Sequence, residues 1–155
     1  MAKIRVEGLY KIFGPNPKKA LQMLSKGRTK DEIMAETRHG VGVNNASFEV
    51  KEGEIVVVMG LSGSGKSTLV RCLNRLITPT AGKVLVDGQD VATMGDEELR
   101  QLRQRKMGMV FQNFALFPHR TVLENAALGL EIQGREKAER LRLAEEALSM
   151  VGLDG

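Results

Sequence analysis

An α/β fold, in which strands and helices alternate along one chain, is predicted by three observations. Residues 55–59 form a continuous, mainly β-branched run, which is typical of a strand buried on both faces. A glycine-rich loop follows this run and leads into a segment compatible with a helix. Residues 107–111 form a second run of the buried-strand type. The chain has 155 residues, enough for one domain with a modest core.

The segments before the glycine-rich loop are predicted to be two strands separated by a helical insertion. Residues 4–9 alternate apolar and polar side chains, as a half-buried strand does. Residues 15–40 form a polar insertion of two short helices, which we expect to lie on the surface. Thr29 and Glu32 form a capping box that opens the second helix. Residues 41–50 are predicted to be the second strand.

The segments after the loop are predicted to be helices interrupted by a hairpin. A helix is expected over residues 67–76 and a strand over residues 83–86. Asp87 and Gly88 then form the strongest short turn signal and lead into a short strand. Three further helices are expected. The first covers residues 97–106 with Asp96 as N-cap, and the second covers residues 121–130 with a capping box of Thr121 and Glu124. The third is indicated by apolar residues that recur at helical spacing: Leu141, Ala144, Leu148 and Val151.

Composition and charge narrow the class of protein. The net charge is +4 and is mixed along the chain, so a nucleic-acid-binding face is not expected. The densest basic cluster is interpreted as a solvated helix face; it comprises Arg100, Arg103, Arg105 and Lys106. Cys72 is the only cysteine, so no internal disulfide can form. Residues 1–13 lack the apolar core of a secretory signal, and the run 55–59 is too short to span a bilayer.

Residues 60–67 match the phosphate-binding pattern G-x-x-x-x-G-K-[S/T] in full, between a predicted strand and a predicted helix. Glycines let backbone N–H groups converge on phosphate oxygens, and the helix start adds the positive end of its dipole. Lys66 is expected to bridge the β- and γ-phosphates, Ser67 to ligate Mg²⁺, and Thr68 to donate to the α-phosphate. The predicted binding residues are Gly60, Ser62, Gly63, Ser64, Gly65, Lys66, Ser67 and Thr68. The alternative, a glycine-rich turn with a solvated lysine, leaves the pattern unexplained.

Residues 60–67, 110–113 and 116–125 together resemble the ATP-binding subunit of an ABC transporter, and the resemblance covers the whole chain. It implies a P-loop NTPase fold: an ABC-type nucleotide-binding domain with an N-terminal antiparallel β-subdomain. It also implies a core subdomain over residues 1–112, which includes the insertion 15–40, and the start of a helical subdomain over residues 113–155.

The resemblance assigns roles to two further residues. Gln112 stands where the family has its Q-loop glutamine, which reaches Mg²⁺ and the attacking water; the alternative is a polar residue that caps a strand end. Phe13 matches the A-loop aromatic that stacks on adenine, with Tyr10 as the competing candidate. A core aromatic is the other interpretation of Phe13.

The insertion 15–40 and residues 71–82 resemble the quaternary-amine uptake branch, which imports glycine betaine, proline betaine, choline or proline as osmoprotectants. This resemblance implies ATP and Mg²⁺ as cofactors. It implies membrane-spanning permease subunits as partners, docked near Leu116 and Phe117, and a second copy of the subunit in a head-to-tail dimer. It places the protein peripherally on the cytoplasmic face of the membrane, without a nucleic-acid partner.

Part of the family's catalytic set is missing from the sequence. Asp87 is followed by glycine rather than glutamate, so residues 84–88 are interpreted as a turn and not as a Walker B strand. The signature-like residues 61–65 lie inside the P-loop. Neither histidine has the context of a switch histidine: His39 is expected on the surface and His119 in a loop near the permease dock.

We therefore expect the chain to stop inside the helical subdomain and to bind ATP without hydrolysing it alone. An unpaired sheet edge is expected to make it prone to aggregation. The alternatives are a non-transport ABC-type ATPase that acts on ribosomes or DNA, and a non-functional gene fragment.

Overall fold

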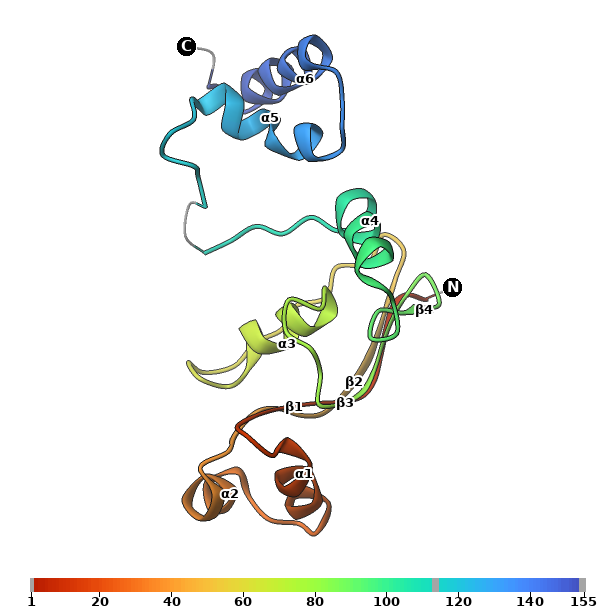
Figure 1. Ribbon diagram of the computed structural model, residues 1–155, viewed down its shortest axis with the longest axis vertical. Coiled ribbons are helices and arrows are strands. Elements are labelled where there is room, and N and C mark those ends of the chain that lie inside the picture. Colours follow the sequence, from red (N-terminus) through yellow and green to blue (C-terminus); the bar gives the residue numbers. More distant parts are fainter. Residues whose placement is uncertain (1, 113–114, 154–155) are drawn as a thin grey trace. The chain divides into compact units, whose positions relative to one another are not determined.

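The structure is a computed structural model that describes residues 2–112 and 115–153 (Figure 1). Internal contacts divide the chain into two units, Met1–Gly95 and Asp96–Gly155, and each is described by itself. The subdomain boundary expected after residue 112 stays a prediction. Asn113, which belongs to the family-like motif 110–113, and Phe114 lie outside the described residues.

The first unit is built on an antiparallel sheet, which within the described residues has the strand order β2-β1-β3-β4. The strands are β1 (Ala2–Phe13), β2 (Gly40–Lys51), β3 (Ala81–Val86) and β4 (Gln89–Asp90). Buried aliphatic residues of β1 and β3, among them Val6, Leu9 and Val84, form its apolar core. The predicted N-terminal antiparallel β-subdomain is confirmed. β1 and β2 are longer than predicted because pairing continues to Phe13 and Gly40.

The hairpin between β3 and β4 confirms the interpretation of Asp87 as a turn residue. Asp87 and Gly88 have φ angles of 50° and 79°, as a two-residue hairpin loop of type I′ requires. The Asp87 carboxylate lies 2.8 Å from the Lys3 ammonium, and this hydrogen bond raises the pKa of Lys3. Asp87 therefore has a structural role at the edge of the sheet.

The insertion between β1 and β2 forms the two predicted helices, α1 (Pro17–Ser25) and α2 (Lys30–Thr37). The capping box of Thr29 and Glu32 is present in full. A small core joins the insertion to the sheet, because Ala20 and Ile33 are buried with Ile12 of β1. The insertion is thus seated on the end of β1.

His39, at the end of the insertion, is buried and not on the surface as expected. Its side chain is 4% exposed, and both ring nitrogens have partners. The Asn16 amide donates to Nε2 at 3.1 Å, and Nδ1 lies 3.0 Å from the Thr37 carbonyl oxygen. Gly14 packs against the ring so closely that a Cβ there would lie 2.4 Å from Cδ2. The expectation was wrong because a histidine whose two nitrogens are satisfied by the backbone can be buried without an unpaired polar group.

Helix α3 (Lys66–Leu73) packs on β2 and ends earlier than predicted. Arg75 takes a left-handed conformation with φ 53°, which stops the helix. The following loop returns to the sheet, where the Thr80 amide donates to the Tyr10 carbonyl at 2.7 Å and Thr80 Oγ1 accepts from the Ile12 amide at 2.9 Å. The exit of α3 is therefore tied to the end of β1.

The second unit contains helices α4 (Asp96–Lys106), α5 (Val122–Ile132) and α6 (Lys137–Met150), of which α5 and α6 pack together (Figure 1). The capping box of Thr121 and Glu124 is confirmed. Ala144 is buried as predicted, whereas Val151 is 69% exposed because α6 ends one residue before it. On α4, acidic residues lie in the first turn and basic residues in the last, which complements the helix dipole.

The two predicted buried strands, residues 55–59 and 107–111, are wrong for this structure. Neither segment is paired within the described residues, and their side chains are open to solvent: Ile55 is 89%, Val57 70% and Val110 99% exposed. A strand exists only through hydrogen bonds to a neighbour, and these two runs lie in different units. Their sequences have the composition of a strand, but composition does not identify the neighbouring strand with which each would pair.

Candidate phosphate-binding site

The glycine-rich loop, residues 60–66, leads directly into α3. The Ser64 amide donates to the Leu61 carbonyl at 3.2 Å and closes the loop into a turn. Gly63 and Gly65 have φ angles of 76° and 97°, in the left-handed region that glycine tolerates best. The loop therefore reverses direction immediately before the helix, as a phosphate cradle requires.

Gly65 also packs so closely against β2 that there is no room for a side chain. A Cβ at this position would lie 1.9 Å from the Gly42 carbonyl oxygen of β2. Gly65 is the N-cap residue of α3 and supplies no side-chain cap, so the first amides of the helix point out of the helix without a side-chain acceptor from the cap. Open amides at a helix N-terminus favour an anionic ligand.

The Lys66 side chain folds back over the loop. Its ammonium donates to the Gly60 and Leu61 carbonyl oxygens, both at 2.7 Å, and lies 3.4 Å from Ser64 Oγ. These contacts hold a positive charge inside the curve of the loop. The next residues differ in exposure: Ser67 is exposed and Thr68 is partly buried.

Phe13 and Thr68 of α3 both lie close to Gly42 of β2. An ideal Cβ on Gly42 would be 2.8 Å from Phe13 Cε2 and 3.0 Å from Thr68 Cγ2, so the ring and the Thr68 methyl flank the same bare backbone. The ring is 43% exposed and is therefore not a core aromatic. Tyr10, the competing candidate, pairs with Ala81 of β3.

Gln112 belongs to the second unit, where it lies at a bend with an exposed side chain. Its role at the phosphate site stays a prediction. His119 lies in a loop, as expected, with its ring 5.7 Å from that of Phe117 in an edge-on arrangement.

Two residues near the loop were missed by sequence reasoning. Gly42 sits inside a strand, where glycine signals close backbone approach, and this signal was available. Lys11 lies two residues before Phe13, a spacing that puts both side chains on one side of a regular strand, although the register of β1 shifts on both sides of Lys11. The structure places the Lys11 ammonium 5.1 Å from the centre of the Phe13 ring.

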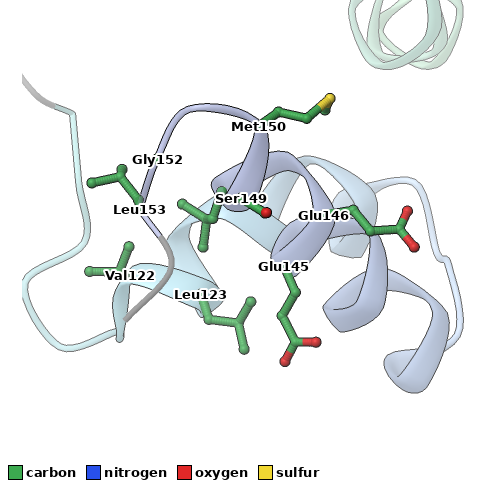
Figure 2. Close-up of a pocket in the computed structure, with 9 residues that line it drawn as sticks. Val122, Leu123, Glu145, Glu146, Ser149, Met150, Gly152 and Leu153 are labelled. Atoms are coloured by element: carbon green, nitrogen blue, oxygen red, sulfur yellow. The ribbon is translucent and has the colours of Figure 1, made fainter.

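A separate groove lies in the second unit, between the start of α5 and the end of α6 (Figure 2). Val122, Leu123 and Leu153 give it apolar walls, and Glu145 and Glu146 stand at its side. The negative charges of these carboxylates disfavour a phosphate ligand. The groove therefore does not compete with the glycine-rich loop as the phosphate site.

The described residues offer neither a cluster of metal-ligating side chains nor a helix that could span a membrane. Across residues 2–112 and 115–153, no group of three or more His, Cys, Asp or Glu residues is placed to hold a metal ion. In the same part of the chain, no helix is both long enough and apolar enough to cross a bilayer.

Comparison with known proteins places this loop in a family context. Residues 43–155 match the family described as ABC transporter. The chain is 60% identical, over 99% of its length, to the glycine betaine transport ATP-binding protein OpuAA of Bacillus subtilis. It is 53% identical, over 98% of its length, to the glycine betaine/proline betaine transport system ATP-binding protein ProV of Salmonella typhimurium. It spans 37% and 38% of the lengths of these two relatives.

A solved structure shares the fold. The ATP-binding cassette MJ0796, determined as a dimer in a post-hydrolysis state bound to ADP and Pi, superposes with a TM-score of 0.75. The match covers 95% of this chain and 56% of the solved one, at 31% identity.

Proposed function

Because the chain belongs to the ABC transporter family, we propose that residues 60–68 bind the triphosphate of ATP. The observation that carries this proposal is the loop itself: left-handed glycines, an uncapped helix start and the Lys66 ammonium converge on one small volume. A triphosphate carries several negative charges and needs many donors in such a volume. The bound nucleotide of the MJ0796 cassette supports the same assignment by likeness.

Each residue of the loop has a distinct part in this proposal. Gly63, Gly65 and Lys66 offer backbone amides, and the Lys66 ammonium exchanges its carbonyl partners for the β- and γ-phosphates. Those carbonyls lie only 2.7 Å from Nζ, so a small movement of a flexible side chain is sufficient. Thr68 donates to the α-phosphate, and Phe13 stacks on the base.

Mg²⁺ fits the residues that the loop offers. It is a hard cation that takes one or two protein oxygens together with phosphate oxygens and water, and Ser67 offers an exposed hydroxyl of this kind at the start of α3. The Ser67 hydroxyl would hold it, whereas a ligand role for Gln112, which belongs to the second unit, stays a prediction. Bound there, the cation would neutralise part of the negative charge of the phosphates.

For the longer protein we infer energy coupling in an importer of glycine betaine or proline-type osmoprotectants. The support is the printed function of the two relatives, OpuAA and ProV, with which the chain shares more than half of its aligned residues. Residues 1–155 alone are proposed to bind ATP without turnover, because the Walker B-like residues 84–88 form a turn at Asp87 and residues 1–155 contain no signature motif and no histidine in the context of a switch histidine.

The partners proposed are permease subunits and a second copy of the chain, as in the dimeric cassette. The surface proposed for the permease lies at Leu116 and Phe117. The Phe117 amide donates to Asn125 Oδ1 at 2.8 Å, and Asn125 Nδ2 donates to the Phe117 carbonyl oxygen at 3.2 Å. The preceding residue, Leu116, is 64% exposed. Leu116→Asp should reduce co-purification with permease subunits and leave ATP affinity unchanged; unaltered co-purification would contradict this surface.

The nucleotide proposal is tested by titrating the purified chain with a fluorescent ATP analogue in the presence of Mg²⁺. We expect saturable binding that unlabelled ATP displaces and that Lys66→Ala abolishes. Ser67→Ala should weaken binding in Mg²⁺ more than in EDTA, because only the first condition uses the hydroxyl. Equal affinity of the native chain and Lys66→Ala would refute the site.

A further inference from the structure

We propose that Lys11 is a positioning residue, which holds the Phe13 ring in place for stacking against the nucleotide base. The inference rests on the proposed function, because it concerns the base end of the same site. It adds a residue that the glycine-rich pattern does not contain.

Two contacts fix the Lys11 side chain. Its ammonium lies over the Phe13 ring, 5.1 Å from the centroid, within the range of a cation–π interaction. The same ammonium donates to the Thr78 carbonyl oxygen at 2.9 Å. A long, flexible lysine with only the ring as partner would be free to leave it, whereas the carbonyl anchors it there.

The anchor connects the ring to the helix that carries the phosphate loop. Thr78 follows α3, and its neighbour Thr80 hydrogen-bonds to Tyr10 and Ile12 of β1. The strand end and the segment after α3 are therefore joined on both sides of Lys11, through Tyr10 and Ile12. The Lys11 ammonium therefore connects the Phe13 ring to the segment that follows α3, and the N-terminus of α3 is proposed to bind the phosphates.

One edge of the Phe13 ring also packs against the backbone of Gly42. Cε2 would be 2.8 Å from a Cβ on Gly42, so the ring lies close against the bare backbone next to Thr68. It remains 43% exposed and thus keeps surface for a ligand. An aromatic side chain that is already fixed loses less conformational entropy when a base stacks on it. Lys11 should therefore strengthen base binding without touching the phosphates.

Substitution of Lys11 should change the affinity for a nucleotide but not the affinity for a ligand without a base. Lys11→Met keeps the aliphatic length of the side chain and removes its charge, whereas Lys11→Arg keeps a cation able to donate to Thr78. The affinities to be measured are those for ATP and for inorganic tripolyphosphate, which has no base. Lys11→Met should weaken ATP by about two- to fivefold, the effect of one exposed cation–π contact, and leave tripolyphosphate unchanged. Lys11→Arg should restore most of the ATP affinity.

Phe13→Leu serves as the matched background. Once the ring is gone, Lys11→Met should no longer change the ratio of the ATP and tripolyphosphate affinities, and circular dichroism should show that each variant is folded. An unchanged ratio in Lys11→Met, or tighter ATP binding because the lysine had covered the ring, would overturn the inference. Failure of the native chain to bind tripolyphosphate would instead overturn the proposed function, and the inference with it.

Discussion

Gly65→Ala is the substitution for which the structure gives the clearest magnitude. The new Cβ would lie 1.9 Å from the Gly42 carbonyl oxygen, and real Cβ contacts essentially never fall below 3.0 Å. The loop or β2 must therefore move by about 1 Å. Alanine at φ 97° adds a backbone cost of about 1–2 kcal/mol. Overpacking against a rigid neighbour adds about 1–3 kcal/mol, so we expect a total loss of about 2–5 kcal/mol in the free energy of unfolding.

Gly63→Ala is the matched control for this substitution. Gly63 also has a left-handed backbone, at φ 76°, but a Cβ there meets nothing within 4 Å. It should lose only the backbone part, about 1–2 kcal/mol. The assay is urea unfolding followed by the fluorescence of Tyr10, the only tyrosine in a chain without tryptophan, which lies in β1 of the first unit. Equal destabilisation by the two substitutions would refute the contact between the loop and β2.

Three further predictions concern other parts of the chain. His39→Ala leaves the Asn16 amide without its acceptor and should cost about 1–3 kcal/mol, seen as faster proteolysis of the insertion with ATP binding retained; an unchanged cleavage rate would contradict it. The hydrogen bond from the Thr121 amide lowers the pKa of Glu124, so its stabilisation is present above the ordinary value of 4.5 and is lost as the pH falls below it. The melting temperature of Glu124→Gln should consequently fall less on acidification than that of the native chain, and parallel curves would exclude this contribution. Val57→Lys should reduce aggregation, measured by light scattering, without loss of unfolding free energy, because Val57 is 70% exposed; a large destabilisation would show that it is buried.

Apart from the antiparallel β-subdomain, which the family resemblance implied, the features predicted correctly from sequence are those that depend on neighbouring residues. The capping boxes of Thr29 with Glu32 and Thr121 with Glu124 were predicted from their spacing and are present. The turn at Asp87 was predicted because Asp-Gly tolerates two positive φ angles. These signals are local, so the rest of the fold does not alter them.

The features that failed depend on distant partners. The apolar run 55–59 has the composition of a buried strand, but burial and pairing require a second strand that composition cannot name. His39 is polar, and its two backbone acceptor and donor partners could not be inferred from spacing. For the same reason the hydrogen bond of Lys11 to Thr78 emerged only from the structure, because Thr78 is far along the chain.

The central claim is that backbone amides at the start of α3, together with Lys66, hold a triphosphate. The most direct measurement is a titration of the isotopically labelled chain with MgATP, followed by the backbone amide resonances. We expect saturable shifts concentrated on residues 60–68, with the largest at Gly63, Gly65 and Lys66, and we expect Lys66→Ala to abolish them. Shifts that are absent, or that concentrate on the groove between α5 and α6, would contradict it.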